Sequence, residues 1–148
     1  AKTGALIVIE QNVRLDEYER TGIVIDSVLT SQILINIFEH NTPLHDGAVI
    51  VRGNRITAAT CYLPLSDNML LSKELGTRHR AGVGISEVTD SLTVIVSEET
   101  GAISVAYKGE LMRKLTAEEL KKLLVMAQNK TAAQKKFRLW KGWNKNEI

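Results

Sequence analysis

The feature that most constrains the fold is the first apolar run of the chain, residues 5–9, which reads Ala-Leu-Ile-Val-Ile. The run is rich in β-branched residues and favours a strand. Because successive side chains of a strand point to opposite faces, an uninterrupted apolar run predicts a strand that is covered on both faces. We therefore expect residues 5–9 to lie inside a sheet that has further layers on both sides.

The rest of the chain alternates strand patterns with helix patterns. We expect further strands at residues 22–25, 48–51, 56–63, 91–96, 102–106 and 110–114. We expect a polar turn or short helix at 16–20, a helix capped by Thr30 or Ser31, a short helical turn at 70–75, a helix capped by Thr77 that ends near Ser86, and a last helix opened by the capping box of Thr116 and Glu119. This order predicts an α/β fold with a mixed parallel and antiparallel central sheet flanked by helices.

Two glycines interrupt the helix that is predicted after Thr77. Gly82 and Gly84 would each weaken it by up to about 1 kcal/mol relative to alanine. Close packing of backbone against this helix would explain their presence, so we expect another segment of the chain to approach it there.

The basic character of the chain comes from its C-terminal end. Six of the 19 lysines and arginines lie in residues 130–148, with one of the 17 acidic residues, so residues 1–129 carry a formal charge of −3. The main part of the chain therefore gives no indication of binding a nucleic acid polymer. The basic end, which also holds Trp140 and Trp143, has two interpretations: a solvated, partly disordered tail, or a segment that touches a membrane surface or a partner.

Length and cysteine content favour one domain in a reducing compartment. At 148 residues the chain is long enough for one real hydrophobic core, and no apolar run approaches the roughly 18 residues that span a bilayer. The first residues do not form a signal-peptide pattern. Cys61 is the only cysteine, and its apolar neighbours predict a buried small side chain.

The first candidate for chemistry is the triplet His45-Asp46-Gly47, which precedes an apolar strand. Adjacent residues at a strand end point to opposite faces, so His45 and Asp46 are expected to serve different atoms of one ligand. Histidine is a common metal ligand, and aspartate a common hydroxyl acceptor or general base. The alternative is a plain turn in which Asp46 caps Gly47 and His45 is merely exposed.

The second candidate is the segment Gly76-Thr77-Arg78-His79-Arg80 at a predicted helix start. The free N–H groups of a helix N-terminus bind anions, and an arginine fork matches phosphate oxygens. The alternative is a solvated basic patch paired with Glu74 or Glu87. Because Arg78 and Arg80 are two residues apart, they cannot both face one site on a regular helix, and one of them is expected to be structural.

Two strand ends add further candidates. Ser97 and Glu98 follow a strand at a hairpin, where a carboxylate is usually solvated but can also complete a metal site shared with phosphates. Tyr62 and Leu63 end another strand, where the ring could stack on a base or belong to the core. The chain contains no Walker A, Gly-x-Gly-x-x-Gly or Gly-x-Ser-x-Gly motif and no zinc-binding cysteine pair. The residues alone thus support a phosphate-ligand site with a possible metal.

Four segments in register resemble one family. They are 44–50 (Leu-His-Asp-Gly-Ala-Val-Ile), 61–66 (Cys-Tyr-Leu-Pro-Leu-Ser), 71–81 (Leu-Ser-Lys-Glu-Leu-Gly-Thr-Arg-His-Arg-Ala) and 96–101 (Val-Ser-Glu-Glu-Thr-Gly). Together they resemble the catalytic domain of bacterial diadenylate cyclases, of the membrane-anchored type found in Firmicutes. The resemblance covers residues 1 to about 127, so we expect a catalytic domain at 1–128 and a basic tail at 129–148.

The resemblance implies an activity and a set of residue roles. The family condenses two ATP molecules into cyclic di-AMP and two pyrophosphates with Mn²⁺, Mg²⁺ or Co²⁺. By position, Asp46 would activate the ribose 3′-hydroxyl beside Gly47, and His45 and Glu98 would hold the metal. The other implied ATP contacts are Tyr62 and Leu63 at the adenine, Gly76, Thr77, Arg78 and Ser97 at the phosphates, and Arg80 in support; His79 would be structural.

The resemblance also implies partners and a location. Ring closure needs two protomers face to face, and family members are reported to work beside a YbbR-domain regulator and phosphoglucosamine mutase. Anchored members lie on the cytoplasmic side of the membrane, whereas this chain would be a soluble catalytic fragment. The alternative function is an ATP-binding module that is catalytically silent.

Overall fold

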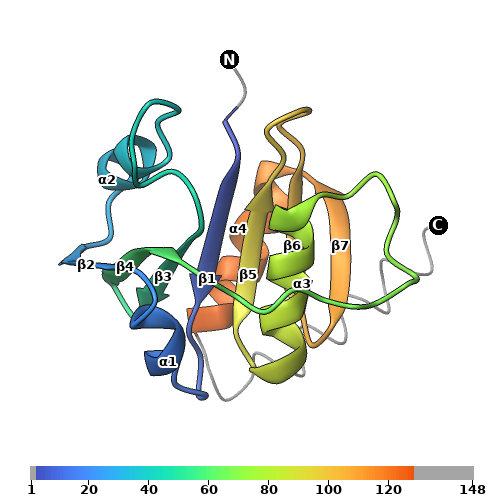
Figure 1. The fold of residues 1–148 in the computed structure, drawn as a ribbon, viewed down its shortest axis with the longest axis horizontal. Helices are drawn as coiled ribbons and strands as arrows, with labels where there is room; N and C mark the ends of the chain where they lie inside the picture. The colour runs from blue at the N-terminus through green and yellow to red at the C-terminus, as the bar shows by residue number, and fades with distance from the viewer. Residues whose placement is uncertain (1–2, 129–148) are drawn as a thin grey trace.

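The computed structural model describes residues 3–128, which form a seven-stranded sheet with helices on both faces (Figure 1). The strands are β1 (Ala5–Ile9), β2 (Ile23–Val28), β3 (Ala48–Arg52), β4 (Arg55–Cys61), β5 (Leu92–Val96), β6 (Ile103–Tyr107) and β7 (Glu110–Leu115). The helices are α1 (Asp16–Glu19), α2 (Ser31–Ile37), α3 (Thr77–Val88) and α4 (Ala117–Gln128). The predicted basic tail lies outside the described residues.

The sheet is mixed, as predicted, with strand order β2-β4-β3-β1-β5-β6-β7. β1 lies at its centre, parallel to β3 and antiparallel to β5. All other neighbours are antiparallel. The predicted hairpin of β3 and β4 is present.

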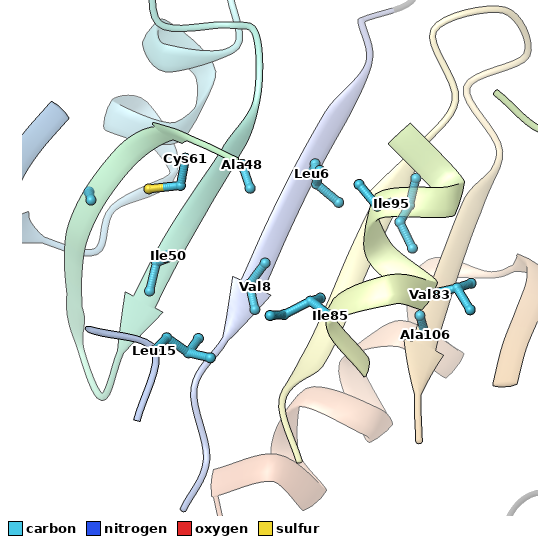
Figure 2. Close-up of a cluster of buried hydrophobic side chains, with 12 residues drawn as sticks. Leu6, Val8, Leu15, Ala48, Ile50, Cys61, Val83, Ile85, Ile95 and Ala106 are labelled. Atoms are coloured by element: carbon cyan, nitrogen blue, oxygen red, sulfur yellow. The ribbon is translucent and has the colours of Figure 1, made fainter. Parts of the chain in front are cut away.

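β1 is covered on both faces, as its apolar run requires. On one face, Leu6 and Val8 pack in a cluster that includes Val83 and Ile85 of α3 (Figure 2). On the other face, Ile7 contacts both the cluster beneath α2 and the cluster beneath α4. Figure 1 shows α3 and α4 on opposite sides of the sheet.

Local sequence signals set several element boundaries. Thr30 caps α2, because its hydroxyl accepts a hydrogen bond from the amide of Ile33 at 3.1 Å. The capping box of α4 is reciprocal: the Thr116 amide donates to Glu119, and the Glu119 amide donates to the Thr116 hydroxyl.

Cys61 is buried, and burial raises the pKa of its thiol to about 11, which agrees with a packing role.

Other boundaries differ from the predictions. β2 extends to Val28, and β4 ends at Cys61, two residues before the predicted end. Residues 70–75 form turns, so the short helical turn predicted there is wrong. Gly76 and not Thr77 is the N-cap of α3, which continues past Ser86 to Val88. Within residues 3–128 no helix combines the length and the apolar character needed to cross a membrane.

An ionic cluster fixes α1 to the end of the sheet that lies opposite the candidate residues. Arg52 donates to Glu10 at 2.6 Å, and it also pairs with Glu19 of α1. The buried Glu10 carboxylate accepts a further hydrogen bond from the amide of Leu15 at 2.8 Å. Burial by itself would raise the pKa of Glu10, but the hydrogen bonds from Arg52 and Leu15 outweigh it and hold the pKa below its usual value.

We expect Glu10→Gln to lower the free energy of unfolding by about 2 kcal/mol at pH 7, because a charge-assisted hydrogen bond is lost. A carboxylate with a lowered folded-state pKa stabilises the protein above its unfolded pKa and loses that contribution as the pH falls through the folded value. The difference between variant and wild type should therefore shrink as the pH falls below about 4. Urea unfolding of both proteins at a series of pH values measures this difference in the free energy of unfolding. Asp26→Asn, which breaks the exposed pair with Arg55, is the control and should change little.

Candidate active site

The candidate residues meet at one edge of the sheet. Strand pairing places Ala48 opposite Cys61 and Ala5 opposite Val96. The segments that flank these strand ends therefore lie along the same edge. They are residues 45–47, 62–63 and 97–98. The periodicity of the sequence does not reveal which segments share this edge, because their placement depends on the direction in which each strand runs.

α3 begins at this edge, beside the hairpin between β5 and β6 (Figure 1). A pocket of about 600 Å³ lies between them. Its lining includes five of the predicted site residues: Gly76, Thr77, Arg78, Ser97 and Glu98. The structure thus joins the predicted anion-binding helix start and the predicted turn carboxylate in one cavity.

Arg78 contributes a largely buried cation to the lining of this pocket, with 19% of its side chain exposed. Its guanidinium lies 3.9 Å from the Glu98 carboxylate, so the basic patch pairs across the pocket rather than with Glu74 or Glu87. The guanidinium also packs against Gly4, where an added Cβ would lie 2.6 Å from Arg78 Cζ. Arg78 belongs to the first turn of α3, so its charge and the free N–H groups of that turn both attract phosphate oxygens.

Ser97 organises the turn that forms the opposite wall. Its hydroxyl accepts hydrogen bonds from the amides of Glu99 at 3.2 Å and Thr100 at 3.3 Å. Because both contacts use lone pairs of the oxygen, the hydroxyl hydrogen remains available to donate to a ligand oxygen. Glu98 follows in the same turn with an exposed carboxylate.

His79 lies at the pocket but is buried. Burial lowers its pKa, and the charges of Arg113 and Arg78 lower it further. The imidazole is therefore neutral at pH 7, which agrees with the structural role expected for it.

Arg80 does not line the pocket. Its carbonyl oxygen accepts a hydrogen bond from the amide of Ser66, which ties α3 to the segment that follows β4. The expectation that only one of the two arginines faces this site is confirmed, and the supporting role of Arg80 stays a prediction.

Asp46 and Gly47 lie in the loop before β3, outside the pocket lining. Asp46 is exposed, and its Oδ1 accepts a hydrogen bond from the Gly47 amide at 3.0 Å. Gly47 has φ 78°, and an added Cβ would lie 2.9 Å from the backbone of Thr60. Glycine is required there, and the result is an exposed carboxylate at a fixed place on the sheet edge.

His45 is held by its own loop. Nδ1 lies 2.6 Å from the carbonyl oxygen of Thr42. That oxygen can only accept, so Nδ1 carries a hydrogen, and in the neutral form of the ring Nε2 then offers a lone pair. A ligating histidine is commonly fixed in this way by a backbone carbonyl. The described residues contain no group of three His, Cys, Asp or Glu side chains that could hold a metal, so His45 and Glu98 form no complete site by themselves.

Tyr62 has an exposed ring, with 73% of the residue accessible, so the interpretation as a core aromatic is wrong. Its amide donates to the hydroxyl of Thr21 at 2.8 Å, which fixes the backbone while the ring stays available. Leu63 packs partly on the core cluster of the α3 face. The pair therefore offers a flat surface on a fixed backbone at the sheet edge.

The pocket lining also holds charged residues that were not predicted as site residues, among them Glu74, Arg113 and Lys114. Arg113 and Glu74 form an ion pair at 2.6 Å between β7 and the segment before α3. Arg113 and Lys114 lie in a segment whose pattern is that of a strand with a solvated face. No signal in the sequence therefore marked them as site residues.

A family model described as the DisA bacterial checkpoint controller nucleotide-binding domain (DAC) matches residues 1–111. A diadenylate cyclase of Listeria monocytogenes is 55% identical over 143 residues, which cover 95% of this chain and 52% of the relative. The cyclic di-AMP synthase CdaA of Bacillus subtilis is 61% identical over 123 residues, covering 83% of this chain and 45% of the relative. The chain spans about half the length of these relatives.

Solved structures are similar as well. A crystal structure of a double mutant of DacA from Staphylococcus aureus matches with a TM-score of 0.84 and 54% identity, over 85% of this chain and 84% of that one. A structure titled as a hypothetical membrane spanning protein from Bacillus cereus matches with a TM-score of 0.74 and 46% identity, over 76% of this chain and 55% of that one. The match to the DacA structure confirms the predicted α/β fold with a mixed sheet.

Proposed function

The chain belongs to the DAC family of nucleotide-binding domains, and on that premise we propose that residues 1–128 condense two ATP molecules into cyclic di-AMP and two pyrophosphates. The observation that carries this proposal is the convergence of a carboxylate loop, an exposed aromatic ring and an anion-binding pocket on one sheet edge.

Each part of the edge has a place in the reaction. The α3 N-terminus, Thr77 and Arg78 bind the triphosphate together with the Ser97 hydroxyl. Tyr62 stacks on adenine, and Leu63 meets the edge of the base. Asp46 accepts the proton of the ribose 3′-hydroxyl as that oxygen attacks the α-phosphorus of the second ATP, and pyrophosphate leaves. Catalysis then rests on positioning and on neutralisation of phosphate charge.

The donor set fits a divalent cation that is shared with phosphate. His45 offers Nε2 and Glu98 an exposed carboxylate, and phosphate oxygens would supply the remaining ligands because the described residues do not. We propose Mn²⁺, Mg²⁺ or Co²⁺ at this place. When bound, such an ion neutralises phosphate charge and assists the departure of pyrophosphate. Engagement of Glu98 by the ion would also release Arg78 for the phosphates.

Ring closure requires a second copy of the chain. The 3′-hydroxyl of one bound ATP must reach the α-phosphate of another, so two protomers face each other about a two-fold axis. Activity should therefore depend on protein concentration. The relatives are about twice as long as this chain, and for a longer protein of that length a YbbR-domain regulator and phosphoglucosamine mutase remain the predicted partners.

We also propose that the longer protein carries this domain on the cytoplasmic side of the membrane. The likeness to the Bacillus cereus structure titled as membrane spanning supports the proposal.

Incubation of the chain with ATP and Mn²⁺ should yield cyclic di-AMP, separable by reverse-phase chromatography. The specific rate should rise with protein concentration, because the active unit is a pair of protomers. Metal-dependent ATP binding without product at any protein concentration would contradict the cyclase and support the alternative, a catalytically silent ATP-binding module.

A further inference from the structure

We propose that Arg113, with Lys114 beside it, binds the terminal phosphates of ATP at the outer wall of the pocket, and that Glu74 competes with those phosphates for Arg113. The inference rests on the proposed function, because it assigns two β7 residues to the triphosphate that the reaction consumes.

A β-bulge directs both basic side chains to the pocket. Ile103 pairs with Leu115, but Val105 pairs with Met112, so Arg113 and Lys114 together oppose the single residue Ser104. In a regular strand two consecutive side chains would point to opposite faces. Lys114 instead has φ 58°, a left-handed conformation that is unusual for lysine, and all three residues line the same pocket. Bulges commonly re-aim side chains beside functional sites.

The pocket contains two arginines, and an acid is paired with each. Arg78, whose side chain is 19% exposed, faces Glu98 at 3.9 Å, and the more exposed Arg113 binds Glu74 at 2.6 Å. Glu98 has a proposed metal to bind, which would free Arg78. Glu74 has no such role, so its pairing with Arg113 occupies a cation that lines the cavity.

Charge balance favours phosphate as the ligand of Arg113. A helix N-terminus supplies only about half an elementary charge, and Arg78 adds one. The proposed divalent ion would add two, but three linked phosphates together with the Glu98 carboxylate still carry more negative charge than these groups neutralise. Arg113 and Lys114 are the cations on the remaining wall, and an arginine fork binds two phosphate oxygens at once.

The pair with Glu74 is suited to exchange. The side chain of Glu74 is 66% exposed and that of Arg113 38% exposed, so water screens the pair and it contributes little to stability. A polyphosphate that displaces Glu74 would offer Arg113 more negative charge and two oxygens for its fork. The ion pair therefore acts as a weak competitor and not as a structural lock.

Calorimetric titration of the full chain with inorganic pyrophosphate, and then with ATP, each with Mn²⁺, tests the inference. Arg113→Ala should weaken binding of both by about tenfold, and Arg113→Lys by less, because lysine keeps the charge but not the fork. Lys114→Ala should weaken binding by a smaller factor. Glu74→Gln should tighten binding by about threefold, since it removes the competitor. In turnover these changes should appear mainly in KM.

Arg55→Ala is the matched control, because it also removes one arginine and one exposed ion pair. Arg55 is the first residue of β4, whereas the candidate residues lie beyond the last residue of that strand. It should leave the affinity for pyrophosphate unchanged. If Arg113→Ala and Glu74→Gln weaken binding alike, the pair is structural and the inference is wrong; unchanged binding in Arg113→Ala also overturns it. A wild-type chain that binds neither probe would overturn this inference together with the proposed function. Binding without product formation would overturn the cyclase activity alone.

Discussion

Replacement of Asp46 by Asn should lower the rate of cyclic di-AMP formation by about 10²–10⁴-fold while most ATP binding remains. The amide cannot accept the proton of the 3′-hydroxyl at neutral pH. Its oxygen can still accept the hydrogen bond from Gly47, so the loop should keep its shape. Asp46 lies outside the pocket that contains Arg78, so the triphosphate keeps its contacts. Chromatography measures product, and calorimetry measures ATP affinity.

A mixture of wild-type and Asp46→Asn chains gives a sharper result. In a mixed pair only one 3′-hydroxyl is activated, so one bond forms and one pyrophosphate leaves. The linear dinucleotide that still carries a 5′-triphosphate should then accumulate as a fraction of the product. Asp67→Asn, in the segment before α3, is the control and should leave the rate unchanged. Product formation by the Asp46 variant within tenfold of wild type would show that Asp46 is not the base.

Gly84→Ala should destabilise the fold by about 2–3 kcal/mol and lower the melting temperature by about 10 °C. An added Cβ would overlap the carbonyl oxygen of Pro64 and lie 2.7 Å from its carbonyl carbon and 3.0 Å from the amide of Ser66. Alanine favours a helix by up to about 1 kcal/mol, which is too little to offset a clash with backbone. The segment after β4 would have to move, and the hydrogen bond from Ser66 to Arg80 would be lost.

Gly82→Ala in the same helix is the matched comparison. There an added Cβ would lie 2.7 Å from the terminal carbon of the Ile95 side chain, which can adjust its rotamer. The loss of stability should therefore be smaller than for Gly84→Ala, as measured by thermal and urea unfolding of both variants. Equal losses would show that the approach of the Pro64 backbone does not determine the effect.

The candidate site was predictable in its parts. The sequence placed Asp46, Arg78 and Glu98 beside strand or helix ends, because turn residues and apolar runs mark those ends locally. Its assignment of Thr77 as the N-cap of α3 was wrong, since Gly76 caps the helix by backbone conformation alone. The helical turn predicted at 70–75 was wrong too: Leu71 packs on the core and Leu75 is buried, but turns rather than a helix place them there, and Leu70 is exposed.

The sequence by itself determined the central strand, the mixed α/β class and the chemistry of the site residues. These follow from the local preferences of the residues and from the periodicity of apolar positions, both of which can be read within a single segment. Only the tertiary structure decided that Thr77, Arg78, Ser97 and Glu98 share one cavity, and that Arg113 and Lys114 join them. Strand direction brings the first group together, and a bulge in β7 turns the second group inward. Both depend on pairing between distant segments, because a strand acquires its neighbours only when the sheet forms.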